Sequence, residues 1–303
     1  MYQMTDKRKT VFCAITGIPN VGKSTLINRL VGAKIAITAP KPQTTRTRIM
    51  GVITLDNIQY VFSDTPGMHK PHTKLGEYMQ REIFEAIDGK DLVLFTIYPK
   101  YSLNDEEREM LERIAAERTP VVLVMNKADI LGSRTQGLRM MENLRKEYNF
   151  SDTLAVSAVT GEGIDALMKT VAGYAKEGDF LYDEDTLTDQ PVKILAAEII
   201  REQLIMNLSD ELPYGTAVTV DSFQPRADKE ITDIQVTIIC EKQSQKGIII
   251  GRGGAMLKRI VSAARAEIEQ LLETQVNLKC WVKVRDDWRD NGQYIREYNF
   301  LSR

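Results

Sequence analysis

Short hydrophobic runs alternate with amphipathic stretches over roughly the first 175 residues of the chain. The runs at 10–16 (TVFCAIT), 91–97 and 120–125 (PVVLVM) each have the length of one buried strand. The stretches between them repeat with helical spacing, and one begins at Asn104 and Glu107, which have the spacing of a capping box. This alternation predicts an α/β domain with a doubly wound, mostly parallel sheet.

The C-terminal part of the chain has a different order of elements. We expect α-β-β-α-α-β: a helix at 192–208, strands at 216–223 and 231–240, a short helix, a helix that runs from the loop 251–254 to Leu272, and a strand at 276–284. In the last strand every second residue is apolar, which is typical of a sheet with one buried face. These elements form a second, α+β domain.

The segment 178–191 holds five acidic residues and no basic one, and it has neither helical nor strand periodicity. We interpret it as a linker, although a final acidic loop of the first domain is the alternative. The predicted organisation is a first domain at 1–177, the linker at 178–191, and a second domain at 192–303 with a C-terminal extension.

Residues 17–25 (GIPNVGKST) contain the pattern GxxxxGK[ST] between a predicted strand and a predicted helix. Backbone N–H groups in such a loop, with the positive end of the helix, bind phosphate. Lys23 reaches the β- and γ-phosphates and the Ser24 hydroxyl binds Mg²⁺. This context favours a nucleotide site over a plain glycine-rich turn. The expected contacts are Gly17, Asn20, Val21, Gly22, Lys23, Ser24 and Thr25.

The base is predicted by residues 126–129 (NKAD), which follow a buried strand about 100 residues later. Asp129 can accept from two donors that guanine has and adenine lacks. Asn126 would tie this loop to the phosphate loop and contact the base, and the stem of Lys127 would lie along the purine. Backbone N–H groups at Ser157 and Ala158 would bond the guanine oxygen. The alternative, a helix cap after a strand, does not explain the order of the motifs.

Residues 64–67 (DTPG) lie between these motifs, where Asp64 can hold a Mg²⁺-bound water and the Gly67 N–H can meet a γ-phosphate. The earlier segment 43–46 (QTTR) offers a threonine for Mg²⁺ and the γ-phosphate; we favour Thr45 over Thr44, and a solvated loop with local hydroxyl turns is the alternative. The expected catalytic groups are Lys23, Thr45 and Gly67, and the expected metal ligands are Ser24, Thr45 and Asp64, the last through water.

Met68 follows Gly67, at the position where Ras-like enzymes carry the glutamine that orients water. Hydrolysis would then depend on switch backbone groups, on a partner, or on an added cation. Asn20 stands where some such GTPases ligate K⁺, and it equally fits an ordinary loop asparagine that stabilises the turn.

Residues 251–254 (GRGG) form a GxxG loop between two predicted helices after a β-β unit, the arrangement of a KH domain. Glycines without side chains let a nucleic-acid backbone approach. The stretch 242–265 holds six basic residues and no acidic one, whereas a solvated helix face more often mixes signs. The expected RNA contacts are Lys246, Gly251, Arg252, Gly253, Gly254, Lys258 and Arg259.

The composition agrees with two domains: the chain has 303 residues, of which 43% are hydrophobic. The net charge of -2 does not indicate nucleic-acid binding, so the basic footprint must be local. Cys13, Cys240 and Cys280 lie in strand-like runs, are odd in number and lack metal-ligand spacing, which predicts buried free thiols in a reducing cytosol. No apolar run is long enough for a membrane span, so neither secretion nor insertion is indicated.

The segments GIPNVGKST, PQTTR, DTPGMHKP, NKAD, SAVTGEG and IIIGRGGAMLKRI together closely resemble the Era family of bacterial ribosome-associated GTPases, over essentially the whole chain. The resemblance implies an Mg²⁺-dependent GTPase, and we expect the protein to be cytoplasmic and monomeric. Its KH domain would bind the 3′ end of 16S ribosomal RNA, not DNA, and assist maturation of the 30S subunit. It also implies peripheral association with the inner face of the membrane, for which the sequence carries no signal. Residues 96–99 (TIYP) and Thr216 depart from the family pattern. These departures bear on the protein's contacts with its partners more than on the chemistry of GTP hydrolysis.

Two other functions stay open at this point. The RNA-binding module could be the working part, with a merely structural nucleotide site; GTP turnover discriminates the two. A tRNA-modifying or signalling GTPase with an unrelated C-terminal domain is opposed by the GxxG context.

Overall fold

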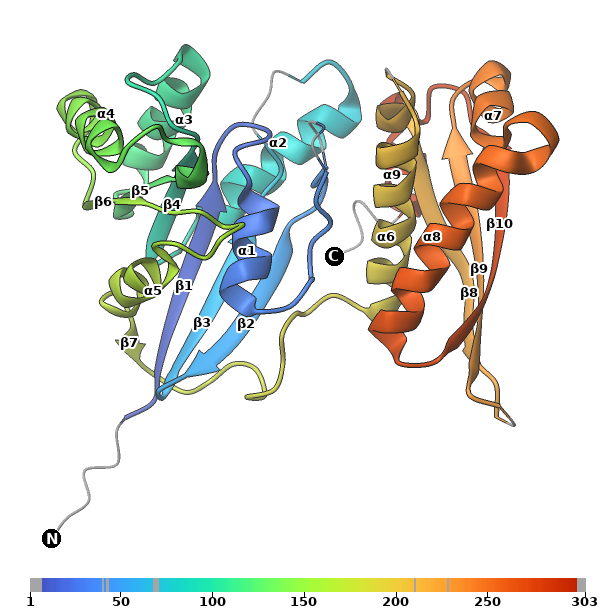
Figure 1. Cartoon of the computed structure of the whole chain (residues 1–303), viewed down its shortest axis with the longest axis horizontal. Coiled ribbons are helices and arrows are strands. Elements are labelled where there is room, and N and C mark those ends of the chain that lie inside the picture. The colour runs from blue at the N-terminus through green and yellow to red at the C-terminus, as the bar shows by residue number, and fades with distance from the viewer. Residues whose placement is uncertain are drawn as a thin grey trace, which may run out of the picture. The chain divides into compact units, whose positions relative to one another are not determined.

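The computed structural model describes residues 7–39, 41, 44–67, 71–209, 211–227 and 229–298. The chain divides into two compact units (Figure 1). The first comprises 1–36, 45–70 and 78–189, and the second comprises 37–44, 71–77 and 190–303.

The first unit is built on a sheet of seven strands. Their order is β2 (Ile49–Leu55), β3 (Ile58–Asp64), β1 (Lys9–Thr16), β4 (Leu92–Ile97), β5 (Val121–Met125) and β6 (Asp152–Ala155), and β7 (Lys176–Glu177) pairs with β1. Strands β3, β1, β4, β5 and β6 are parallel to their neighbours, whereas β2 runs antiparallel to β3 and β7 antiparallel to β1. The prediction of a mostly parallel α/β sheet is confirmed.

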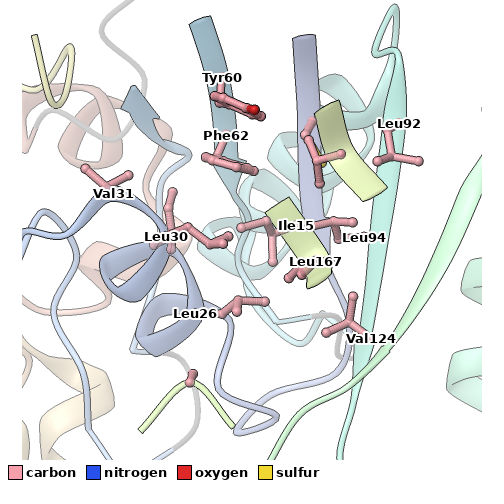
Figure 2. Close-up of a cluster of buried hydrophobic side chains, with 14 of the residues drawn as sticks. Ile15, Leu26, Leu30, Val31, Tyr60, Phe62, Leu92, Leu94, Val124 and Leu167 are labelled. Atoms are coloured by element: carbon pink, nitrogen blue, oxygen red, sulfur yellow. The ribbon is translucent and has the colours of Figure 1, made fainter. Parts of the chain in front are cut away.

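Helices cover both faces of this sheet: α1 (Lys23–Val31), α2 (Lys74–Ile87), α3 (Asp105–Ala116), α4 (Arg134–Glu147) and α5 (Ile164–Ala172). Ile15 of β1 packs with Leu26 of α1 and Leu167 of α5 on one face (Figure 2). The next residue back, Ala14, belongs to the core on the opposite face, because side chains of a strand alternate. The capping box at Asn104 is confirmed, since its side chain accepts from the Glu107 N–H at the start of α3.

The second unit has the predicted order of six elements: α6 (Val192–Asn207), β8 (Ala217–Pro225), β9 (Ile231–Cys240), α7 (Gln243–Ile250), α8 (Ala255–Leu272) and β10 (Gln275–Val284). The sheet order is β10-β9-β8, with β10 parallel and β8 antiparallel to β9. Helices α6 and α8 lie against one face of this sheet (Figure 1) and enclose Ile234, Val236 and Ile238 of β9. A short helix, α9 (Gly292–Glu297), follows β10.

The acidic segment after β7 packs along the first unit. The Gln59 side chain accepts from the N–H groups of Leu181 and Tyr182, and the Thr188 hydroxyl donates to the Met50 carbonyl. Contacts assign this segment to the first unit as far as Asp189. The linker boundaries at 178–191 stay a prediction, but the segment is held along β2 and β3.

All three cysteines are free thiols. Cys13 and Cys240 are buried as expected, whereas the expectation was wrong for Cys280, which is partly exposed because β10 is an edge strand. Burial raises the pKa of the Cys280 thiol to about 12. Within the described ranges no group of three or more His, Cys, Asp or Glu side chains could hold a metal ion.

The described part of the chain contains no helix that is both long and apolar enough to cross a lipid bilayer.

Candidate functional site

The phosphate loop lies between β1 and α1, and two of its glycines have no room for a side chain. Gly17 has φ 146° and Gly22 has φ 91°, in the region that favours glycine. A Cβ atom at Gly17 would lie 2.2 Å from the Thr96 carbonyl oxygen, and one at Gly22 would lie 2.4 Å from Nδ2 of Asn126. The loop is therefore pressed against the ends of β4 and β5.

Lys23 is buried at the first position of α1. Its Nζ donates to the carbonyls of Gly17 and Ile18, each at 3.0 Å. Burial lowers the pKa of Lys23 to about 8, and the nearby Asp64 carboxylate opposes this shift. A phosphate group at the loop would favour the charged ammonium, which is the role predicted for Lys23.

Three side-chain oxygens from separate elements converge beside Lys23. The Ser24 Oγ lies 2.8 Å from Thr45 Oγ1 and donates to Asp64 Oδ2 at 2.8 Å, and Thr45 Oγ1 lies 3.3 Å from the same carboxylate oxygen. Asp64 is fully buried, and burial raises its pKa to about 6 against the opposing effects of Lys23, the two hydroxyls and the backbone of Thr65. Its Oδ1 is buried without a hydrogen-bond partner in the described part of the chain. Hydroxyl and carboxylate oxygens around an unpaired buried oxygen fit Mg²⁺ with its water shell.

The neighbouring threonine is oriented differently. Thr44 Oγ1 donates to the Lys41 carbonyl at 2.7 Å. The contacts of Thr45 with Ser24 and Asp64 thus agree with the preference for Thr45 as a metal ligand, which stays a prediction.

The segment after β3 closes on the phosphate loop. A Cβ atom at Gly67 would lie 2.8 Å from Pro19, and the Thr65 hydroxyl donates to the Ile15 carbonyl at 3.0 Å. The backbone of Gly67 therefore lies close to the phosphate loop, and its contact with a γ-phosphate stays a prediction. Met68, like Gln43, lies outside the described residues.

The NKAD segment makes the predicted connection to the phosphate loop. Nδ2 of Asn126 donates to the Val21 carbonyl at 2.9 Å, and Nζ of Lys127 donates to the Asn20 carbonyl at 2.7 Å. Lys127 has φ 61° and Asn20 has φ 64°, so both hold left-handed conformations, which is less costly for asparagine than for most residues. The NKAD segment and the phosphate loop are thereby joined by two side-chain hydrogen bonds.

The base-reading carboxylate is oriented by a serine. The Ser157 hydroxyl donates to Asp129 Oδ1 at 2.6 Å. The Ala158 N–H donates to Oδ1 of Asn126 at 3.0 Å, and the Ser157 N–H donates to the Glu162 carbonyl at 2.9 Å. Both N–H groups predicted for the guanine oxygen thus already have protein acceptors, and the base oxygen would have to share the Ala158 donor.

Arg29 belongs to this site, and the sequence reasoning missed it. It lies in the last turn of α1, where its Nε donates to the Ala158 carbonyl at 2.8 Å and its guanidinium also bonds the Val159 carbonyl. Helix α1 therefore carries the phosphate residues at its first turn and, at its last turn, holds residues 157–159, which we call the base loop. No sequence signal identified Arg29, because a cation near a helix C-terminus is ordinary dipole complementation.

The GxxG loop connects α7 to α8. Gly251, Gly253 and Gly254 have φ values of 73°, 57° and 79°. A Cβ atom at Gly251 would lie 2.7 Å from Met256, whereas Cβ atoms at Gly253 and Gly254 would meet nothing within 4 Å. The loop backbone at 253–254 is therefore open to an approaching chain.

The predicted basic contacts surround this loop. Arg252, Lys258 and Arg259 are exposed and Lys246 is partly exposed. Within the described ranges, none of these four cations has a salt-bridge partner at 4.0 Å or less. Their charge is therefore available to phosphates.

Comparison with known proteins agrees with both units. The chain matches the families described as "50S ribosome-binding GTPase" over residues 12–127 and "KH domain" over residues 211–289. It is 46% identical to the GTPase Era of Ruminiclostridium cellulolyticum, over 96% of this chain and 97% of the relative. It is 42% identical to the GTPase Era of Clostridioides difficile, over 96% and 98% of the two chains.

Two solved structures are similar over their full length. One is a single-residue variant of Aquifex aeolicus Era bound to GDP·AlF₄⁻, and the other is Era in complex with MgGDPNP and nucleotides 1506–1542 of 16S ribosomal RNA. Each aligns with a TM-score of 0.94 at 36% identity, covering 97% of this chain and 100% of the other.

Asp129→Asn should weaken GTP binding by on the order of 10²-fold or more and shift preference to xanthosine nucleotides, whose donor and acceptor at that edge are reversed. Competition binding with GTP and XTP measures the change. Glu142→Gln, an exposed acid on α4, is the matched control and should leave both affinities unchanged. An Asp129→Asn protein that still prefers GTP would refute the assignment.

Arg29→Met should accelerate dissociation of GDP and GTP alike by about 5- to 50-fold, because two carbonyls of the base loop lose a charged donor. Arg29→Lys should restore part of the loss. Stopped-flow release of a fluorescent guanine nucleotide measures the rate, with Arg139→Met on α4 as the control. If Arg29→Met lowers the melting temperature but leaves the dissociation rate unchanged, Arg29 does not position the base loop.

Proposed function

The chain belongs to the Era family of GTPases, and on this premise we propose that it is a GTP-driven switch that binds the 3′ end of 16S ribosomal RNA and assists maturation of the 30S subunit. It hydrolyses GTP to GDP and phosphate. The observation that carries the nucleotide half is the cluster of Ser24, Thr45 and Asp64 beside Lys23, with one buried Asp64 oxygen left for a metal-bound water.

Each group has one role in this proposal. Lys23 and the loop N–H groups hold the phosphates, Ser24 and Thr45 ligate Mg²⁺, and Asp64 holds a water of the metal. When bound, Mg²⁺ neutralises charge on the β- and γ-phosphates. The Gly67 N–H binds the γ-phosphate, which is the group that is transferred to water while GDP leaves. The relative bound to MgGDPNP supports the choice of metal and nucleotide.

Asn126, Lys127 and Asp129 hold the guanine, with the Ala158 N–H on its oxygen. Support comes from the contacts that already join this segment to the phosphate loop. Arg29 keeps the base loop in place from α1.

The RNA half rests on the GxxG loop, where the open backbone at Gly253 and Gly254 adjoins unpaired cations. The relative crystallised with nucleotides 1506–1542 of 16S ribosomal RNA supports this partner. In this proposal the protein works in the cytoplasm and as a monomer, and the ribosomal partner is the support for the location. Peripheral association with the inner membrane stays an implication of the family resemblance.

The two alternatives are set aside. A merely structural nucleotide site disagrees with membership of a GTPase family, and an unrelated C-terminal domain disagrees with the KH match over residues 211–289.

Hydrolysis also uses a monovalent cation in this proposal, because Met68 cannot orient water. Turnover should be faster in K⁺ than in Na⁺, and Asn20→Ala or Asn20→Asp should abolish the difference. Phosphate release in matched chloride salts measures it. Equal turnover of the parent in both salts would remove K⁺ from the proposal and leave the GTPase intact.

Changing Arg252 and Gly253 together to Asp should abolish binding of an RNA that copies the 16S 3′ end, because two carboxylates would face the nucleic-acid backbone. Aspartate is among the residues that tolerate the left-handed conformation of Gly253. GTP affinity and basal hydrolysis should survive, and any stimulation of hydrolysis by RNA should vanish with binding.

Filter binding at several salt concentrations, alongside phosphate release, tests this prediction. Lys193→Asp, an exposed charge reversal on α6, is the control. RNA affinity within about threefold of the parent would mean that the GxxG loop is an ordinary turn. Lost GTP binding would mean that the two units are not separable.

A further inference from the structure

On the sheet of the second unit, the face opposite α6 and α8 is buried at one end, where Ile239 of β9 and Ala217 of β8 have almost no exposed surface, and it is exposed farther along β10. Helices α6 and α8 pack on the face that carries Val276 and Val282 of β10. The intervening residues Lys279, Trp281 and Lys283 point to the opposite face and are exposed. Trp281 keeps 49% of its surface exposed, which is unusual for the largest apolar side chain on a strand.

The residues that pair across the sheet from Trp281 are short and polar. It pairs with Thr237 of β9, which pairs in turn with Thr219 of β8. These short side chains leave the indole as the one large ring in its row. Trp288, in contrast, is fully buried and donates from its Nε1 to the Gly215 carbonyl at 3.0 Å, so it is a core residue.

The two lysines of this face make no ion pair, although the charge of Lys279 acts on the nearby Asp233 carboxylate. Lys279 and Lys283 have no ion-pair partner within the described residues. Two acids share the face, and each has partners: Asp221 accepts from both threonines of the row, at 3.3 Å from Thr219 and 2.6 Å from Thr237.

The second acid, Asp233, is bonded to Arg226 at 2.6 Å and to Asn277 at 2.7 Å, and these bonds hold its pKa below the ordinary value. Cations two residues to either side of an exposed indole, each about 6.6 Å from it along the strand, match a stacked nucleobase flanked by phosphates.

Strand β10 connects this face to the GxxG loop. It is an edge strand that pairs with β9, and α7, which leads into the loop, packs against it. A GxxG loop clamps about four nucleotides, so a longer RNA needs further contacts. The GxxG loop and Trp281 thus lie on adjoining elements of one unit.

We propose that Lys279, Trp281 and Lys283 form a second RNA contact, at which an unpaired base stacks on the indole and the two ammonium groups bind the adjoining phosphates. This inference rests on the proposed function for its ligand, single-stranded RNA. Base stacking is the sequence-tolerant mode that fits a single exposed ring beside short polar side chains.

The chain contains only two tryptophans, so fluorescence reports on the site directly. RNA copying nucleotides 1506–1542 of 16S ribosomal RNA should quench the emission of Trp281 and protect it from iodide. In Trp281→Phe the remaining emission comes from the buried Trp288 and should change little on addition of RNA.

Affinity supplies the second measurement. Trp281→Ala should weaken binding of this RNA by at least about fivefold, and Trp281→Phe by less, because phenylalanine keeps a ring on which a base can stack. Lys279→Gln and Lys283→Gln should each lower the slope of log affinity against log salt by about 0.7. Lys193→Gln on α6 should leave both affinity and slope unchanged. Thermal melting of each variant shows that the unit is folded.

The outcomes separate this inference from the proposed function. The second contact is refuted, and the switch stands, if the double Asp change in the GxxG loop abolishes RNA binding while Trp281→Ala behaves like the parent. Behaving like the parent means that Trp281→Ala binds RNA within about twofold of the parent and that RNA still quenches the emission, which then comes from Trp288. A parent protein that binds no RNA refutes both. A change in sedimentation of the RNA-free protein on Trp281→Ala would instead mark the face as an interface between copies and overturn the RNA assignment.

Discussion

The nucleotide site depends on how closely the loops at the carboxyl ends of the parallel strands approach one another. The phosphate loop touches the end of β4 at Gly17 and the end of β5 at Gly22, with no room at either position for a Cβ atom. This contact lets Asn126 bond the loop carbonyls, so that the groups for phosphate and base are fixed relative to each other. Pre-organisation of this kind lowers the entropy that binding would otherwise cost.

The close packing of these loops also buries two ionisable groups, Lys23 and Asp64, and a bound ligand would offset the free energy that burying their charges costs. Burial lowers the pKa of Lys23 and raises that of Asp64, so both groups are driven toward neutrality. A phosphate beside Lys23 and a cation beside Asp64 each favour the charged form. The site is thus built from groups whose ionisation and ligand binding support each other, which is a common property of functional sites.

Local rules in the sequence determined the fold class, the order of the elements and the motifs. Hydrophobic runs predicted strands such as β9, and the capping box at Asn104 predicted the start of α3, because periodicity and caps depend on neighbouring residues. The GxxxxGK[ST], NKAD and GxxG segments were readable because each function needs fixed residue types at fixed spacing. These signals placed the candidate site residues but not their contacts.

Only the tertiary structure decided which residues meet. Arg29 reads as an ordinary helix-end cation, and it holds the base loop only because α1 lies beside residues that follow it by well over a hundred positions. Thr44 and Thr45 are adjacent and identical in type. In the structure the Thr45 hydroxyl contacts Asp64, whereas the Thr44 hydroxyl donates to the Lys41 carbonyl. Trp281 and Trp288 lie close together in the chain, yet one is half exposed and the other fully buried. Long-range packing made each distinction, and no local pattern encodes it.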